Sequence, residues 1–186
     1  MGGPKVDITI KKFTKEDLNY SFTIDDQFEV DSILLLKTTE HSIQYSVREV
    51  LPYEKKYSEN QDDLLDLQKY INHPDQAIFL AIDRDDIVGM VLVRRNWNEF
   101  AYVEDIKVDR KYRRNGIGCL LMNEAKNWSQ NNGFAGIMLE TQNNNVSACK
   151  FYERYGFIIG GFDKFVYKGI NYLTEEVAIY WYLIFE

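Results

Sequence analysis

The order of hydrophobic and polar residues predicts strands through the first half of the chain. Residues Lys5 to Lys12 alternate, with Val6, Ile8 and Ile10 on one side, as expected of a half-buried strand. Further strands are predicted at Ser32–Lys37, Ser42–Leu51, Gln76–Ile82, Ile87–Val93 and Phe100–Val108. The turn residues 83–86 predict that the strands at Gln76–Ile82 and Ile87–Val93 form a hairpin. A short helical face is predicted between Leu64 and Ile71, ending before Pro74.

A helical period of hydrophobic residues enters in the second half. Ile117 to Trp128 predicts a helix that ends at the Asn131-Asn132-Gly133 cluster. A second helix, from Ala148 to Tyr155, ends at Gly156. Strands are predicted at Phe134–Glu140, Phe157–Gly160, Phe165–Lys168 and Val177–Phe185. This order of elements indicates an α/β fold with a mixed sheet.

Size and composition limit the classes of protein that fit. The chain has 186 residues, of which 45% are hydrophobic, so we expect one domain with its own core. The net charge is −7, which argues against nucleic acid as the main partner and agrees with a cationic ligand. Cys119 and Cys149 are expected to be free thiols, and the spacing of His41 and His73 predicts no metal site.

The sequence carries no clear targeting or membrane signal. No run reaches the roughly 18 apolar residues of a membrane span. The first residues, Met1-Gly2-Gly3-Pro4-Lys5, lack the apolar region of a signal peptide. We therefore expect a cytoplasmic protein that does not bind membranes.

The segment Arg113-Arg114-Asn115-Gly116-Ile117-Gly118 lies between a predicted strand and a predicted helix. A helix N-terminus carries N–H groups without intrahelical partners and a partial positive charge, so it binds anions such as phosphate. Glycines allow the backbone to turn tightly and to approach the ligand. The segment lacks the third glycine of a dinucleotide motif and the Gly-Lys-Ser/Thr of a nucleotide P-loop. The alternative interpretation is a loop that only caps the helix.

A second motif, Asn145-x-x-Ala148-x-x-x-Tyr152 followed by Gly156-Phe157, lies downstream. Together with Arg-x-x-Gly-x-Gly, it resembles the acetyl-CoA signature of the GNAT N-acetyltransferases. Within that superfamily, the residues 94–98, 102–106, 138–144, 148–152 and 180–183 are similar to the streptothricin acetyltransferases. The resemblance covers most of 76–186 and is weaker over 1–75.

The resemblance implies a fold and a cofactor. It implies one GNAT domain over 1–186, with an N-terminal portion at 1–75 and a cofactor-binding and catalytic core at 76–186. The implied fold has a mixed, mostly antiparallel central sheet that is flanked by helices and splayed at the acetyl-CoA site. The backbone of Ile106, Lys107 and Val108 would pair with the pantetheine arm, and Asn145 would touch the same arm directly or through water. The residues assigned to the pyrophosphate are Arg113, Arg114, Asn115, Gly116, Ile117 and Gly118.

Three residues are candidates for the chemistry of acetyl transfer. By resemblance, Tyr152 protonates or hydrogen-bonds the departing CoA sulfur; the alternative is a core aromatic at helical spacing. Glu104 is favoured as the base, acting directly or through water, and Asp105 as a structural group or a contact for the substrate ammonium. Successive strand residues face opposite sides, so only one of the two carboxylates should face the substrate unless a bulge re-aims it.

The acceptor is identified only by resemblance, which implies the amine of the β-lysine moiety of streptothricin, a small cationic substrate. Alternatives are a protein lysine, a polyamine, an aminoglycoside, or acetyl-CoA sensing without turnover. The candidate pocket walls are Trp97, Tyr102, Tyr180 and Tyr182, with Tyr180 and Tyr182 on one strand face and Trp181 on the other. The acidic residues Asp62, Asp63 and Asp66 could surround a cation or form a solvated face; Lys11-Lys12 and Arg94-Arg95 are expected to be solvated. The resemblance leaves a homodimer open.

Overall fold

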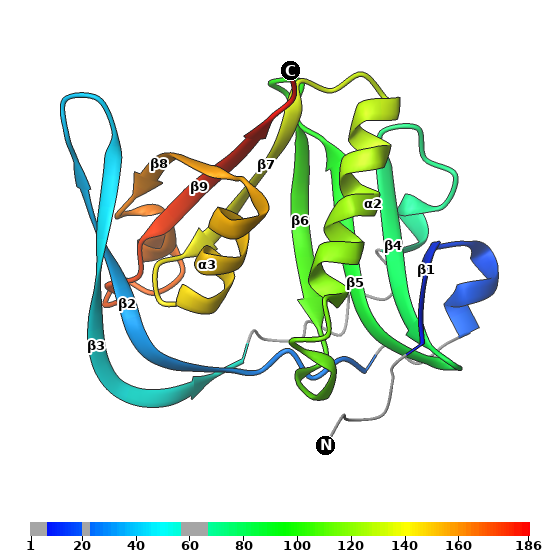
Figure 1. Cartoon of the computed structure of the whole chain (residues 1–186), viewed down its shortest axis with the longest axis horizontal. Coiled ribbons are helices and arrows are strands. Elements are labelled where there is room, and N and C mark those ends of the chain that lie inside the picture. Colours follow the sequence, from blue (N-terminus) through cyan, green and yellow to red (C-terminus); the bar gives the residue numbers. More distant parts are fainter. Residues whose placement is uncertain (1–6, 20–22, 57–66) are drawn as a thin grey trace. The chain divides into compact units, whose positions relative to one another are not determined.

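The computed structural model describes residues 7–19, 23–56 and 67–186, and these residues form parts of two compact units (Figure 1). The first unit comprises 1–27 and 56–135, and the second comprises 28–55 and 136–186. The prediction of a single domain over 1–186 stays a prediction. The acidic residues Asp62, Asp63 and Asp66 lie outside the described residues.

The described part of the first unit contains four strands in the order β1-β4-β5-β6, each antiparallel to its neighbour. The strands are β1 (Ile8–Lys12), β4 (Gln76–Asp83), β5 (Asp86–Arg95) and β6 (Ala101–Val108). The predicted hairpin of β4 and β5 is confirmed, with Asp83 opposite Asp86. The helix α2 (Ile117–Asn131) contacts this sheet, and Figure 1 shows it running alongside β5 and β6. Three short 3₁₀ helices complete the described part of the unit: η1 (Lys15–Asn19), η2 (Gln68–Tyr70) and η3 (Arg110–Tyr112).

The two faces of this sheet pack against different parts of the unit. Gly89 of β5 faces α2, because a Cβ at this position would lie 3.2 Å from a Leu121 methyl and 3.4 Å from an Ile117 methyl. Alternate strand residues point to opposite faces, so Met90 and Leu92 face away from α2. On that side lies a hydrophobic cluster of Phe13, Ile24, Leu67, Tyr70, Ile78, Leu80, Ile87 and Met90, with Leu92 packed against it.

The second unit contains a three-stranded antiparallel arrangement in the order β7-β9-β8 and a separate two-stranded ribbon. The strands are β7 (Gly136–Gln142), β8 (Ile158–Asp163) and β9 (Ala178–Ile184). The helix α3 (Val146–Tyr155) follows β7 and ends where Gly156 adopts a φ of +111°, as expected for a glycine after a helix. The ribbon pairs β2 (Phe28–Thr38) with β3 (Ile43–Lys55), longer than the predicted strands but with the same turn.

One sequence prediction is wrong, and two others are refined. Residues 165–168 do not form a strand, because Val166–Gly169 forms the 3₁₀ helix η4 after an Asp163 carboxylate that accepts from the backbone N–H groups of Phe165 and Val166. Arg94 and Lys11 are partly exposed, and each in addition pairs with a carboxylate, at 2.7 Å to Glu104 and at 2.5 Å to the buried Asp17. The predicted helical face at 64–71 lies partly outside the described residues, and its described end is η2.

Candidate active site

The strand β6 carries a β-bulge at Glu104. Leu92 of β5 opposes Asp105 and Val93 opposes Val103, so Glu104 is the extra residue on β6. An extra residue shifts the alternation of side chains by one position. Asp105 therefore points to the face of Leu92, away from α2, instead of sharing the face of Val103. Such a bulge is the exception under which Glu104 and Asp105 were expected to face the same side of the sheet.

Glu104 also points to the face opposite α2, and two side chains hold it there. The Arg94 guanidinium donates from Nε to Oε1 of Glu104 at 2.7 Å, and the buried Tyr70 hydroxyl donates to Oε2. Arg94 follows Leu92 by two residues, which places it on this same face. Each carboxylate oxygen has two acceptor sites, so Glu104 retains the capacity to accept a further hydrogen bond. The side chain is 29% exposed, so an incoming amine or water can reach it.

Two neighbours of this carboxylate complete the cluster. The Arg94 guanidinium lies over the Tyr102 ring, 5.0 Å from its centre, so Tyr102 supports the ion pair. The Asp105 carboxylate lies 3.3 Å from the Lys107 ammonium and is 45% exposed. Arg94 and Lys107 balance the charges of the two carboxylates, whose oxygens keep acceptor positions for the N–H groups of an amine. Trp97, in contrast, is 89% exposed in the connection between β5 and β6.

The other residues of β6 and the following loop have defined roles in the first unit. Ile106, Lys107 and Val108 pair with Val91, Met90 and Gly89 of β5. The Arg113 guanidinium donates from Nε to the Val108 carbonyl at 3.0 Å and from Nη1 to the Gln27 carbonyl at 2.7 Å. The Arg113 side chain therefore binds the loop to the backbone of Val108 and of Gln27.

The glycine loop turns through left-handed backbone conformations before α2. Arg114 has a φ of +66° and Gly116, the N-cap of α2, has a φ of +79°. The Asn115 side-chain amide closes the loop by donating to the Tyr112 carbonyl at 3.0 Å. The helix ladder begins with the bond from Leu120 N–H to the Gly116 carbonyl, so the N–H groups of Ile117 and Gly118 precede it. This geometry is suited to an anion.

Close packing fixes the start of this helix. Ile117 is 2% exposed. One of its methyl groups lies against the position that a Cβ would take if Gly89 were replaced by another residue. That position would also lie 3.0 Å from the Lys107 carbonyl oxygen. Gly89 is not among the residues predicted from the sequence, although a glycine inside a hydrophobic strand is a signal of close approach.

Tyr152 of α3 lies in the aromatic core of the second unit. The residue is 6% exposed, and its ring contacts Phe151 and Phe157 edge-on, with centres 5.3 and 5.7 Å apart, and Trp181 at 6.1 Å. The ring is thus held in place whether or not the hydroxyl takes part in chemistry. Trp181 lies on the α3 face of β9, so Tyr180 and Tyr182 point to the opposite face, as the alternation predicted.

Asn145 and its neighbours order the start of α3. The Asn145 side-chain oxygen accepts from the Ala148 N–H at 3.2 Å, which makes Asn145 the N-cap. The buried Asn143 bonds with its amide to the Leu34 carbonyl at 3.0 Å and to the Val177 N–H at 2.9 Å. Asn143 therefore joins the ribbon, β7 and the approach to β9. Sequence reasoning missed this role because Asn143 stands in a run of three asparagines.

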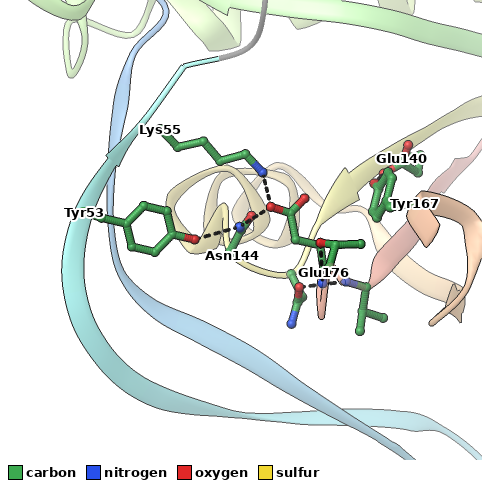
Figure 2. A network of polar contacts seen from close by, with 9 residues as sticks. Tyr53, Lys55, Glu140, Asn144, Tyr167 and Glu176 are labelled. Carbon is green, nitrogen blue, oxygen red and sulfur yellow. Dashed lines mark hydrogen bonds and ion pairs between the residues drawn. The ribbon is translucent and has the colours of Figure 1, made fainter. Parts of the chain in front are cut away.

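A polar network lies around Glu140 of β7 and Glu176, which precedes β9 (Figure 2). Glu140 accepts from the Tyr167 hydroxyl, and Glu176 accepts from Lys55 at 2.6 Å and from Asn144 at 3.1 Å. Burial, reinforced by the nearby Glu176 carboxylate and opposed by Lys55, raises the pKa of Glu140 to about 7. A carboxyl with this pKa changes charge at neutral pH.

Other reactive groups do not form a second centre. Burial raises the pKa of the Cys149 thiol to about 12, so it stays protonated, and Cys119 is a free, exposed thiol. Among the residues that the structure describes, no group of three or more His, Cys, Asp and Glu is placed to hold a metal ion. None of the helices in the described ranges is long and apolar enough to cross a membrane.

A strand, a glycine loop and a helix N-terminus suited to an anion define the class as an α/β protein, and comparison with known proteins identifies its family. The model of the acetyltransferase (GNAT) family matches residues 43–157, more than half of the chain. Streptothricin acetyltransferase A of Bacillus subtilis (strain 168) is 42% identical over 135 residues, covering 72% of this chain and 75% of the relative. Streptothricin acetyltransferase of Escherichia coli is 32% identical over 167 residues, covering 90% and 91%.

A solved structure adds the cofactor. A proposed streptothricin acetyltransferase from Bacillus anthracis str. Ames, crystallised in complex with acetyl coenzyme A, is 46% identical with a TM-score of 0.88, over 97% of this chain and 99% of that one. The chain belongs to the GNAT acetyltransferase family and has its mixed, mostly antiparallel sheet flanked by helices. It is an acetyl-CoA-dependent N-acetyltransferase, and the fold and cofactor predictions are confirmed.

Proposed function

We propose that the enzyme transfers the acetyl group of acetyl-CoA to the β-lysine amine of streptothricin and thereby inactivates the antibiotic. The observation that carries the proposal is the similarity to streptothricin acetyltransferases along nearly the whole chain, including 90% of it for the Escherichia coli relative. The two carboxylates on the face of β6 opposite α2 support an amine acceptor, because their oxygens keep acceptor positions for its N–H groups.

The proposed cofactor site uses the glycine loop and β6. Backbone N–H groups from Arg114 to Gly118 bind the pyrophosphate at the N-terminus of α2, and the backbone of Ile106 to Val108 pairs with the pantetheine arm. Arg113 shapes the loop through its bonds to the Val108 and Gln27 carbonyls. Asn145 contacts the arm in addition to capping α3. The acetyl-CoA complex of the Bacillus anthracis relative supports this assignment.

The proposed chemistry is one direct transfer. The neutral amine attacks the thioester carbonyl, the carbon–nitrogen bond forms, and the carbon–sulfur bond breaks. Glu104 accepts the proton that the nitrogen loses, directly or through water, and Tyr152 donates a proton to the departing thiolate. Solvent exchange then restores both groups. Asp105 holds the acceptor ammonium before it is deprotonated.

A comparison of acceptors tests this function. Steady-state kinetics would be measured with streptothricin, a lysine-containing peptide, a polyamine and an aminoglycoside, and the products would be identified by mass spectrometry. The proposal predicts the highest kcat/KM for streptothricin, with the acetyl group on the β-lysine moiety. Acetylation of the peptide without acetylation of streptothricin would assign the enzyme to protein lysines instead.

A further inference from the structure

The polar network around Glu140 and Glu176 is separate from the groups assigned to acetyl transfer. Glu140 lies on β7 opposite Tyr180 of β9 and points away from α3, since its neighbour Leu139 opposes Trp181 on the α3 face. Figure 2 shows Glu140 with Tyr167, and Glu176 with Lys55 and Asn144. Both carboxylates are only half-buried, so a ligand can reach them.

The charges of this network do not balance. Lys55 pairs with Glu176 at 2.6 Å, and of the charged groups that act on Glu140, Glu176 opposes its ionisation and Lys55 favours it. The described part of the network therefore sets two carboxylates against one ammonium. Tyr167 donates one hydrogen bond to Glu140, which leaves acceptor positions on its carboxylate. A partly buried carboxylate is stabilised when a cation pairs with it, and without one it tends to take up a proton.

Asn144 adds an independent indication that a donor belongs here. This residue is 4% exposed, and its Nδ2 donates to the Tyr53 hydroxyl at 3.2 Å and to Glu176 at 3.1 Å. Because an ionised carboxylate can only accept, the bond to Glu176 fixes Nδ2 on that side of the amide. The Oδ1 atom is then buried and finds no donor among the described residues. A buried acceptor without a partner is costly, and a ligand N–H group would satisfy it.

We propose that Glu140, Glu176 and Asn144 form a subsite for a second cationic nitrogen of the acceptor, distinct from the amine that is acetylated. This inference rests on the proposed function and names the class of acceptor as a polyamine. The ammonium of Lys55, already held by Glu176, shows that the network accommodates a primary ammonium. The acceptor would bring a second one, with Glu140 as its counter-ion. An anionic ligand is excluded by the two carboxylates.

The experiment measures binding rather than turnover. Isothermal titration calorimetry of streptothricin would be performed near pH 7 in two buffers with different ionisation enthalpies, for the wild type, Glu140→Gln and Glu175→Gln. A cation paired with Glu140 favours its ionised form, so binding to the wild type releases protons from this site. Glu140→Gln should bind streptothricin at least tenfold more weakly and release fewer protons. Glu175→Gln, at an exposed position near Glu176, is the matched control and should bind streptothricin as the wild type does. Equal affinity and equal proton release in Glu140→Gln would overturn the subsite.

A second pair of probes separates this subsite from the proposed function. Hexamethylenediamine and hexylamine have the same carbon chain and differ in one amine. The subsite predicts that the wild type binds the diamine more tightly, and that Glu140→Gln removes this preference while Glu175→Gln retains it. If the wild type did not acetylate streptothricin but still preferred the diamine, the proposed substrate would be refuted and the proposed subsite would stand. Normal acetylation of streptothricin with no effect of Glu140→Gln on either probe would refute the subsite alone.

Discussion

The Arg94 guanidinium donates to Oε1 of Glu104 across 2.7 Å, on the face of β6 that lies opposite α2. The bulge supplies this arrangement, because Glu104 is the residue of β6 that has no opposite partner on β5. Tyr70 holds the second oxygen, so the carboxylate is fixed from two sides. Arg94 thus acts as a positioning residue for the base proposed here.

Arg94→Met should reduce kcat/KM for the acceptor about tenfold or more, because a displaced catalytic group costs rate steeply. The affinity for acetyl-CoA should stay the same. Arg95→Met is the matched control, since Arg95 pairs with Asp75 and Glu99 instead of Glu104. Steady-state kinetics on both variants make the comparison, and an equal loss in the two would remove the positioning role of Arg94.

Tyr152→Phe should lower kcat about tenfold or more, on the usual scale for loss of a general acid. The unfolding temperature and the acetyl-CoA affinity should change little, because phenylalanine keeps the ring between Phe157 and Trp181. Tyr155→Phe, one turn later in α3, is the control and should retain full turnover. If Tyr152→Phe also retained full turnover, Tyr152 would be a core residue only.

Gly116→Val should weaken acetyl-CoA binding, because the loop must relax from a φ of +79° that a side chain makes unfavourable by about 1–2 kcal/mol. Apart from the residue itself, its chain neighbours and the backbone of its own helix, no atom of the described residues lies within 4 Å of the added Cβ, so backbone strain is the main effect in the free protein. Gly133→Val, at a φ of +73° after the same helix, is the matched control. Both variants should lose similar stability in thermal unfolding, and only Gly116→Val should lose cofactor affinity. Equal affinity in the two variants would place the phosphate elsewhere.

Asn145 combines a cap with a proposed cofactor contact, and two substitutions separate them. Asn145→Ala should lower the free energy of unfolding by about 1 kcal/mol, since the Ala148 N–H loses its acceptor. Asn145→Ser retains a capping hydroxyl and should stay near wild-type stability. Both should weaken acetyl-CoA binding, measured by calorimetry. Unchanged affinity in Asn145→Ser would limit Asn145 to the cap.

Glu140 should make the stability of the protein depend on pH. Its pKa rises from 4.5 to about 7 on folding, so between these values the folded state holds a proton that the unfolded state has lost. The free energy of unfolding therefore falls as the pH rises through this interval and stays lower above it. Glu140→Gln removes this loss, so its unfolding temperature relative to the wild type should be higher at about pH 8 than at about pH 5. A difference independent of pH, as expected for Glu175→Gln, would contradict the raised pKa.

The sequence predicts the elements around the proposed cofactor site well. The helix from Ile117, the end of α3 at Gly156 and the hairpin of β4 and β5 follow from periodicity and glycines, which are local signals. The strand predicted at 165–168 failed because the side chain of Asp163 bonds to two backbone N–H groups and starts a turn. Such a competing bond is not visible in the hydrophobic pattern.

Tertiary relationships explain what the sequence left open in the candidate site. The bulge at Glu104 depends on the register between β5 and β6, and neither strand alone reveals it. Arg94 looks like a solvated charge until Glu104 lies beside it. Asn143 and Glu140 likewise acquire their roles from distant partners, Leu34 for one and Tyr167 and Glu176 for the other.

The most direct test of the proposed function is acetyl transfer to streptothricin itself. The enzyme would be incubated with acetyl-CoA and streptothricin, free CoA would be followed with time, and the product would be fragmented in a mass spectrometer. We predict one acetyl group on the β-lysine moiety and one CoA released for each acetyl group transferred. Free CoA released only with other amines, and streptothricin recovered unmodified, would contradict the proposed function.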